Sequence, residues 1–271
     1  MAGFEDFIAT WPIWLKIMVG QLLLITIPAS ATYLVLYSWK RGPFRARKIQ
    51  PDFAPTSALR REILYSILTA LIFALNGFCI YLLMGQGWTL VYSDVAEYGW
   101  LYGAFSVVAA IVLHDAYFFW THRMMHHPRL FNLFHRVHHE STSPSPWTAY
   151  SFAPLEGVVQ TLFLTILIFI LPVHVVVIYL FMIHMILRNV IGHSGFELFP
   201  SWVPGHRLFG FLTTNTHHDL HHSAEGVNYG LYFIWWDRIL GTEHPDYRAT
   251  FDRVAGKNGD GNEHGSSEGS G

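Results

Sequence analysis

The chain has 271 residues, of which 52% are hydrophobic and 13% are charged. A typical soluble domain carries about 25% charged residues, so this shortage, together with long apolar runs, predicts an integral membrane protein. The formal net charge of −2 excludes the strongly basic surface of a nucleic-acid-binding protein. The single cysteine, Cys79, excludes an intramolecular disulfide and cysteine-based zinc or iron–sulfur sites, and we predict that it is a buried apolar residue.

Two apolar runs lie in the first part of the chain, at residues 17–39 and 63–84. Each is long enough to cross a bilayer, and Pro28 in the first run is tolerated in membrane helices. The segment between them is basic, which predicts a cytoplasmic loop and an N-terminus on the opposite side. The basic residues of this segment are Lys40, Arg41, Arg45, Arg47, Lys48, Arg60 and Arg61. Residues 1–12 contain no Lys or Arg, unlike a cleaved signal peptide, and the C-terminus shows no lipidation motif.

A third apolar run, at residues 98–120, is predicted to return the chain to the cytoplasmic side. The connector before it, residues 85–97, contains Asp94 and Glu97 but no Lys or Arg, as expected of a non-cytoplasmic loop. The run is followed by Arg123, Arg129 and Arg136. The topology is therefore self-consistent over three crossings.

Residues 158–187 form another apolar stretch, which Pro172 interrupts near its middle. Each half is short for a full crossing. We expect either a helical hairpin that crosses and returns or a shallow re-entrant pair, and both bring Arg188 back to the cytoplasmic side. Loops marked by Pro and Gly follow from residue 192, and the Gly/Ser-rich residues 256–271, including His264, are predicted to be disordered.

These patterns predict an all-α integral membrane protein of four to five hydrophobic helices. Fifteen histidines lie between His114 and His222, and they add to this prediction a histidine-rich helical cap on the cytoplasmic side that holds a di-metal centre. Residues 1–97 are predicted to form the N-terminal membrane helices and the basic loop. Residues 98–255 are predicted to form the histidine-rich domain, and residues 256–271 a tail. The membrane is then a bacterial inner membrane or the endoplasmic reticulum.

Histidine is concentrated in one part of the chain: fifteen of the seventeen histidines lie between His114 and His222. Eight of them form three clusters with spacings of three or four residues, which align side chains on one face of a helix. The clusters are His122 and His126, then His135, His138 and His139, and then His218, His221 and His222. Imidazole is the commonest metal ligand near neutral pH, so the clusters predict a multi-histidine metal site.

Eight nitrogen ligands are too many for one ion, because zinc, for example, usually takes four. Two metal ions with four or five ligands each fit the count. Imidazole suits zinc, copper, iron and nickel, so the spacing does not choose the metal. A proton-relay or pH-sensing cluster is the main alternative, but a relay does not need repeated clusters of three.

The segment from His114 to Glu140, with HDAYFFWTHRMMH at 114–126 and FHRVHH at 134–139, resembles the fatty acid hydroxylase superfamily. HSGFE at 193–197, HHDLHH at 217–222, NYG at 228–230 and WDRILGT at 236–242 resemble further elements of that superfamily. The resemblance covers roughly residues 100–245 and implies that residues 98–255 form the catalytic domain. It implies a membrane-bound di-iron centre that uses O2 as co-substrate to hydroxylate or desaturate a C–H bond of a sterol, fatty acyl chain or related lipid.

The resemblance also implies which residues bind metal. It makes ligands of the eight clustered histidines, His122, His126, His135, His138, His139, His218, His221 and His222, and of His193 as a ninth. Some relatives have a histidine where this chain has Asn189, which is either a ligand through its amide oxygen or a hydrogen-bonding residue at a helix end. Further candidates for ligands or for partners of the ligand rings are His217, His127, His114, Asp115, Asp219 and Asp237. The carboxylates among them are candidates to accept the other ring N–H of a ligand.

The electrons for such a reaction must come from a separate donor, such as cytochrome b5, a ferredoxin or a reductase, because the sequence contains no domain that supplies them. The expected partners are thus a membrane lipid and this donor, and no oligomeric state is predicted. Two other functions remain as alternatives. One is a histidine-rich metal transporter, which would place its ligands midway across the membrane, and the other is a metal-binding membrane protein without catalytic activity.

Overall fold

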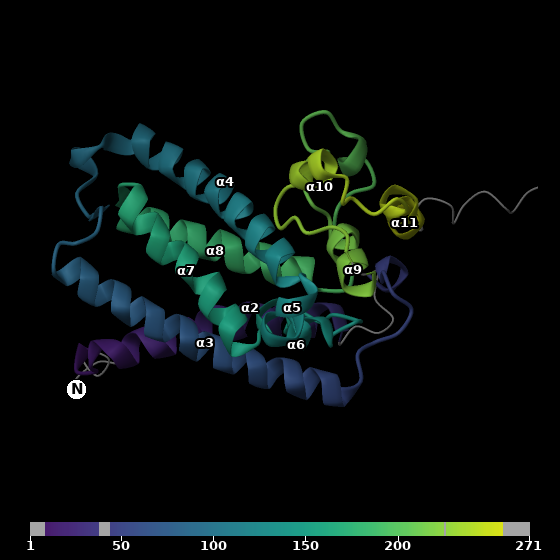
Figure 1. Ribbon diagram of the computed structural model, residues 1–271, viewed down its shortest axis with the longest axis horizontal. Coiled ribbons are helices and arrows are strands. Elements are labelled where there is room, and N and C mark those ends of the chain that lie inside the picture. The colour runs from purple at the N-terminus through teal and green to yellow at the C-terminus, as the bar shows by residue number, and fades with distance from the viewer. Residues whose placement is uncertain (1–8, 38–43, 225, 257–271) are drawn as a thin grey trace, which may run out of the picture.

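The computed structural model describes residues 9–37, 44–224 and 226–256. Within these residues its regular structure is helical apart from two short strands, and Figure 1 shows the long helices beside a smaller group of C-terminal helices. The long helices are α2 (Ile13–Tyr37), α3 (Thr56–Gly85), α4 (Gly99–Met125), α7 (Pro154–Ile170) and α8 (Val175–Gly192). The short ones are α5 (Pro128–Phe134), α6 (Arg136–His139), α9 (Asn215–Ser223), α10 (Trp235–Leu240) and α11 (Tyr247–Ala255), and η1 (Arg45–Arg47), η2 (Val95–Glu97), η3 (Thr148–Tyr150) and η4 (Val203–Gly205) are 3-10 turns.

Within the described residues, α2, α3, α4 and α8 are long and apolar enough to cross a membrane, and α7 is a shorter apolar helix. Large apolar side chains on these helices point outward: Leu101 is 87% exposed, and Leu64 and Leu75 are more than half exposed. Exposed apolar surface of this extent is stable next to lipid and unfavourable next to water. The chain is therefore a multi-pass membrane protein, as predicted.

Proline marks the interruptions that the sequence predicts. Pro28 lies inside α2, which continues through it to Tyr37, and Pro172 separates α7 from α8. The break at Pro172 is followed by the two-residue strand β2 (Val173–His174), which pairs in parallel with β1 (Val91–Tyr92). This pairing ties the α7–α8 turn to the loop before α4. The turn divides the apolar stretch into two helices, as both predicted arrangements require.

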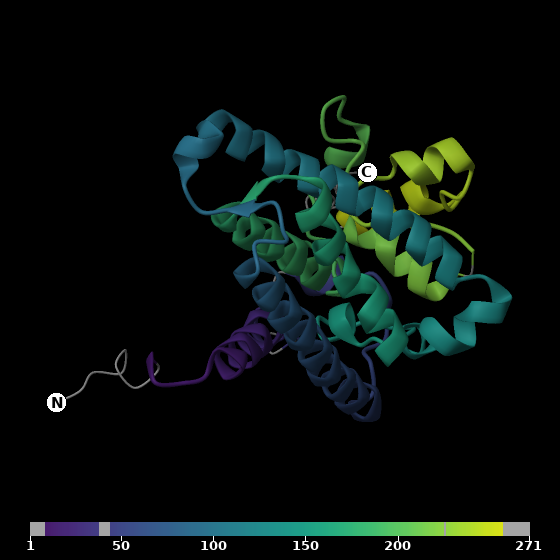
Figure 2. The ribbon, with the colours of Figure 1, turned by 60° about the vertical axis from the view of Figure 1, so that its left-hand side comes forward.

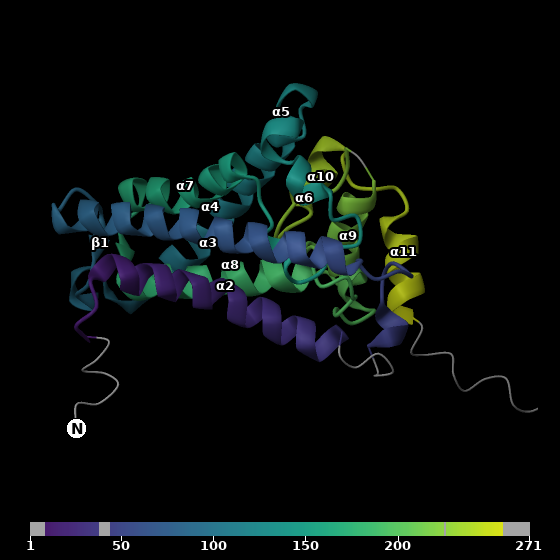
Figure 3. The ribbon, with the colours of Figure 1, turned by 90° about the horizontal axis from the view of Figure 1, so that it is seen from below.

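The helices share one polar end. Figure 3 shows β1 and the α7–α8 turn at one end of the long helices, with η1, α9 and α11 at the other. At this second end Tyr37 of α2 donates a hydrogen bond to the carbonyl of Ser194, which follows α8 (2.9 Å). Glu62 near the start of α3 accepts hydrogen bonds from Ser141 (2.8 Å) and Ser145, which follow α6. The basic loop and the segments that carry the histidines therefore lie at the same end.

The C-terminal segment packs against the end of α4. Figure 2 shows the yellow-green helices beside the C-terminal half of α4. Asp115 makes this contact specific, because its carboxylate accepts hydrogen bonds from the backbone N–H groups of Tyr232 (2.9 Å) and Phe233 (3.2 Å) and from the indole of Trp235 (2.9 Å). Asp115 is fully buried, so these three donors satisfy a carboxylate that burial would otherwise make costly.

The prediction of a buried Cys79 is wrong, because its side chain is exposed on α3. A helix next to lipid can carry apolar side chains on every face, so hydrophobicity alone does not distinguish a core position from a lipid-facing one. The third helix also extends beyond the predicted end at Trp120 and reaches Met125, so it carries His122 in its last turn. The predicted disordered tail lies outside the described residues, apart from Gly256.

Candidate metal centre

Nine histidines gather at the polar end of the bundle in two groups, and the nitrogens in each group lie within 4.8 Å of one another. The group of five consists of His122, His126, His135, His139 and His221, and the group of four consists of His138, His193, His218 and His222. These are the nine histidines that the resemblance implies as ligands. The structure therefore brings all of them together, in the numbers expected for two ions with four or five ligands each.

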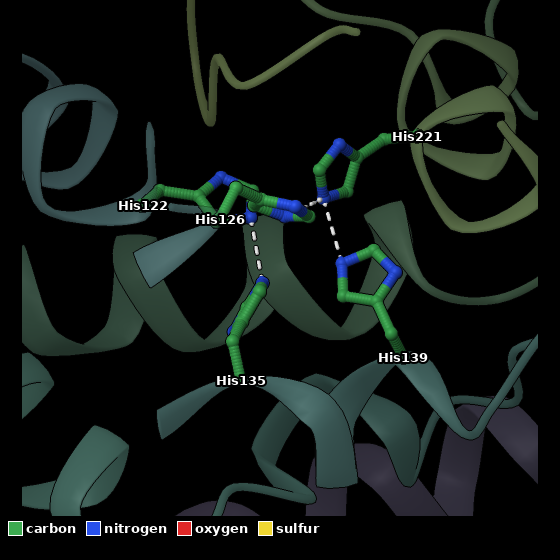
Figure 4. Close-up of side chains that lie close together, drawn as sticks. All are labelled: His122, His126, His135, His139 and His221. Carbon is green, nitrogen blue, oxygen red and sulfur yellow. Dashed lines mark hydrogen bonds between the residues drawn. The ribbon is translucent and has the colours of Figure 1, made fainter. Parts of the chain in front are cut away.

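The group of five joins three separate parts of the chain. His122 is in the last turn of α4, and His126 ends that helix. His135 directly precedes the short α6, His139 is the last residue of α6, and His221 is on α9. Figure 4 shows their rings facing a common centre. The Nε2 atoms of His122 and His135 are 2.9 Å apart, and Nε2 of His221 lies 3.2 Å from that of His126 and 3.0 Å from that of His139.

In the group of four the ring nitrogens also converge on a common centre. Its central residue is His193, which ends α8. The Nε2 atom of His193 lies 2.7 Å from Nε2 of His218 and 3.2 Å from Nε2 of His138. All four rings are buried, and His222 has both ring nitrogens buried without a hydrogen-bond partner in the described chain.

Each three-histidine cluster contributes to both groups. His135 and His139, four residues apart, belong to the group of five, whereas His138 between them belongs to the group of four. In the last cluster His218 and His222 belong to the group of four and His221 to the group of five. The i, i+4 pair thus shares a group and the i+3 residue turns to the other, because one residue rotates the helix by about 100°.

Hydrogen bonds on the far side of several rings hold them in place. Nδ1–H of His122 donates to the carbonyl of Tyr229 (2.9 Å) and that of His221 to the carbonyl of Val227 (2.7 Å). Nδ1–H of His193 donates to the carbonyl of Asn189 (2.8 Å). A neutral imidazole that donates from Nδ1 has an unprotonated Nε2, so the lone pairs of these rings face the centre of each group.

This arrangement fits metal ions. Metal–nitrogen bonds of about 2.0–2.1 Å place two nitrogens on one ion roughly 2.9–3.4 Å apart, close to the separations of 2.7–3.2 Å between the Nε2 atoms. Without a cation the converging lone pairs would repel one another. Burial lowers the pKa of His193 and of His221 to about 4, so both are neutral at physiological pH and have the free lone pair that a metal requires.

Glu156 is a further residue of the site that the sequence analysis missed. It lies in the first turn of α7, is fully buried, and its Oε1 accepts a hydrogen bond from Nδ1 of His135 (2.7 Å). A carboxylate behind a metal-binding histidine orients the ring and raises its basicity. The available signal was its isolation: Glu156 is the one acidic residue between Glu140 and Glu197, at the start of an apolar run.

Asp115, Asp219 and Asp237 accept hydrogen bonds from backbone and side-chain groups around the site. Asp115 holds the C-terminal segment, and Asp219 accepts a hydrogen bond from Gln50 of the basic loop (2.8 Å). Burial raises the pKa of Asp219 to about 6. Asp237 accepts from the backbone N–H groups of Tyr229 and Gly230 (both 2.9 Å). It thereby fixes the loop whose carbonyls receive His122 and His221.

The remaining candidates lie near the groups without entering them. His217 is buried with its Nε2 3.5 Å from Asp237, and His114 contacts the hydroxyl of Tyr232 through Nδ1 (2.9 Å). His127 is exposed and caps α5. The side-chain amide of Asn189 donates to the carbonyl of Ala149 (2.7 Å), and its backbone carbonyl orients His193. The amide nitrogen and the backbone carbonyl of Asn189 thus make hydrogen bonds, and a ligand role of its amide oxygen stays a prediction.

A cleft gives access to the two histidine groups from the polar end. It has a volume of about 650 Å³ and is lined by four ligand candidates, His126, His139, His221 and His222, together with Arg136 and Tyr229. A volume of this size accommodates a small-molecule ligand. Both groups border the cleft, since His222 belongs to the group of four and the other three histidines to the group of five.

We predict that Gly230→Ala destabilises the loop behind the site. A Cβ at Gly230 would collide with the carbonyl oxygen of Phe233 and with the carboxylate of Asp237. Overpacking of this kind costs about 1–3 kcal/mol, which thermal unfolding of the detergent-solubilised protein should register. Gly205→Ala is the matched control, because its Cβ would meet only the flexible end of Arg248 at 3.5 Å. Equal melting temperatures for the two variants would contradict the packing argument.

Comparison with known sequences bears directly on this site. A sequence model of the family "Fatty acid hydroxylase" matches residues 107–242, about half of the chain, including all nine histidines of the two groups. The chain belongs to the fatty acid hydroxylase family. The predicted family is thereby confirmed, and no solved structure matches the chain.

Curated relatives carry the names of sterol-modifying enzymes. The chain is 28% identical over 223 residues to a Delta(7)-sterol 5(6)-desaturase of Gibberella zeae, covering 82% of this chain and 65% of the relative. It is 29% identical to human lathosterol oxidase, covering 86% and 78%. It is 35% identical to Gallus gallus methylsterol monooxygenase 1 over 132 residues, which are 49% of this chain and 44% of the relative. Family and relatives support the predicted lipid oxygenase or desaturase over a metal transporter.

Proposed function

We propose that the protein is a di-iron enzyme that hydroxylates or desaturates a C–H bond of a membrane lipid, with a sterol as the first candidate substrate. The observation that carries the proposal is the convergence of nine histidines in two groups at one end of a membrane bundle, in a chain of the fatty acid hydroxylase family. The names of the relatives, sterol desaturase, lathosterol oxidase and methylsterol monooxygenase, support a sterol.

The nine histidines of the two groups would hold two iron ions, five ligands on one and four on the other. Iron suits an imidazole environment, and the proposal of iron rests on the family. The bound irons supply the O2-dependent oxidation. Hydroxylation consumes the lipid C–H, O2, two electrons and two protons and yields an alcohol and water. Desaturation removes two hydrogens from adjacent carbons with the same inputs and yields an alkene and two waters.

The protein itself orients the proposed metal ligands and provides an apolar cavity for the substrate. Glu156 and the backbone carbonyls of Tyr229, Val227 and Asn189 hold the ligand rings in one orientation. A cavity of about 420 Å³ lies among the five long helices and is lined mainly by apolar side chains, with His114 in its wall. This cavity supports a lipid substrate, because it offers hydrocarbon-lined space inside the membrane region.

We place the centre on the cytoplasmic face. The end of the bundle that carries the histidines is basic: Arg45, Arg47 and Lys48 precede α3, and Arg60 and Arg61 lie in its first turns. Asp94 and Glu97 belong to the opposite end. Basic loops remain in the cytoplasm, so the charge distribution supports this orientation. The electrons come from a separate protein donor, which approaches from the same side.

The test is expression in a sterol-containing host, followed by mass spectrometry of the extracted lipids. We expect a lipid species heavier by one oxygen or lighter by two hydrogens. His138→Ala should abolish this product, because His138 supplies one of the four nitrogens that would bind the metal ion in its group. The exposed His127 provides the matched control, and His127→Ala should retain the product. A lipid profile that does not change with the active protein would remove sterols from the proposal.

A further inference from the structure

A second lipid-facing cleft is lined by other residues of α8 than the cavity just described. It has a volume of about 430 Å³ and runs between α4 and α8, which lie side by side in Figure 1. Val108 and Val112 of α4 form one wall, and they are 61% and 40% exposed. Leu212 and Phe233 of the C-terminal segment form another. The cleft therefore opens where hydrocarbon chains of the bilayer contact the protein.

The polar end of this cleft is formed by Arg188. Its Nη2 donates to the carbonyl (3.1 Å) and to the hydroxyl (2.8 Å) of Thr213, and its guanidinium lies 5.3 Å from the ring centroid of Phe199. These contacts fix the guanidinium and use two of its five N–H groups. Among the described residues no carboxylate lies within 4.0 Å of it.

Three N–H groups of Arg188, on Nε and Nη1, thus remain without an acceptor in the described chain. His184 lies one helical turn earlier on the same wall, and its Nε2 is buried without a hydrogen-bond partner. A partly buried cation without a counter-charge is costly, and the fork of a guanidinium matches the two oxygens of a carboxylate. Both unsatisfied groups point to a negatively charged ligand.

We propose that the α4–α8 cleft binds a single-chain anionic lipid, a long-chain fatty acid, with its carboxylate on Arg188 and its chain along Val108 and Val112. The volume lies near the lower end of the range of about 300–1,000 Å³ for ligand pockets, which suits one chain better than two. Arg188 lies near the polar end of α8, four residues before Gly192, so the carboxylate would reach water while the chain stays in hydrocarbon. None of the nine histidines of the two groups lines this cleft, and the proposal does not depend on the proposed reaction.

The test measures binding of radiolabelled oleate to the full chain in neutral-lipid nanodiscs. We expect Arg188→Gln to weaken oleate binding at least tenfold, because the charge-assisted hydrogen bonds are lost, and Arg188→Lys to recover only part of it. Oleyl alcohol, which lacks the charge, should bind the unaltered protein and Arg188→Gln equally weakly. Arg129→Gln, a change at an exposed arginine outside the cleft, should leave oleate binding unchanged.

A second variant tests the apolar wall and does not alter the buried hydrogen bonds. Val108→Trp should fill the cleft and reduce oleate binding, whereas Leu101→Trp, at a position of α4 that is 87% exposed and does not line the cleft, should not. Thermal unfolding of every variant separates loss of binding from loss of fold. Unchanged oleate affinity in both Arg188→Gln and Val108→Trp would overturn the proposal, and so would displacement of oleate by an equimolar amount of phosphatidylglycerol.

Discussion

His193→Ala is expected to reduce the metal content of the iron-loaded protein from two ions per chain to one and to abolish lipid oxidation. His193 is central to the group of four, with its Nε2 2.7 Å from that of His218 and 3.2 Å from that of His138. Its loss leaves three nitrogens for an ion that would otherwise have four, whereas the group of five retains every member. Elemental analysis by inductively coupled plasma mass spectrometry measures the ratio directly.

His127→Ala is the control for this experiment, because His127 lies between the first two clusters but is exposed and belongs to neither group. It should retain two ions per chain. His126→Ala, one residue earlier, should instead weaken binding in the group of five. An unaltered protein that binds one ion, or a His193→Ala protein that keeps two, would contradict the assignment of two separate sites.

Glu156→Gln is expected to lower metal affinity or turnover by about 10–100-fold, the usual effect of removing a carboxylate behind a histidine ligand. The glutamine keeps the size of the side chain but removes the negative charge that makes the His135 ring more basic. Both side chains are at most 2% exposed, so water does not replace the lost interaction. Competition with a chelator measures the affinity, and steady-state kinetics with the identified lipid measure turnover.

The matched control for Glu156 is Glu140→Gln, which changes the same functional group directly after the second cluster. Glu140 lies 3.3 Å from Arg61 and 3.8 Å from Arg136 at the surface, where ion pairs contribute about 0–1 kcal/mol. Its removal should leave the metal affinity within about twofold. If Glu156→Gln retains the affinity of the unaltered protein while its melting temperature falls, the carboxylate supports the fold and does not tune the ligand.

The membrane helices followed from the sequence because the bilayer imposes a length and a composition on each crossing. The runs at 17–39, 63–84 and 98–120 predicted α2, α3 and α4, and Pro172 predicted the break between α7 and α8. The hydrophobic pattern could not predict which side chains of these helices face lipid and which face the protein core. Cys79 was expected in the core and is exposed, because lipid and core both accept an apolar side chain.

The partners of the ligand rings also escaped the sequence. Asp115, Asp219 and Asp237 were candidates because they lie within or beside the motifs, yet Glu156 contacts His135 from a helix twenty-one residues further along the chain. The carbonyls of Tyr229 and Val227 are likewise invisible in a sequence, since every residue has one. Such contacts are set by which loop the fold brings behind each ring.

The sequence alone determined the membrane helices and the eight clustered histidines, because hydrophobic length and repeated histidine spacing are local properties. The motifs that resemble the family added the ninth histidine, His193. Only the tertiary structure decided how these histidines divide. His135 and His139 face one centre and His138 the other, and His221 crosses over from His218 and His222. Spacing within a cluster sets the angle between its rings, but which group a ring joins depends on the position of α4, α8 and α9 around it.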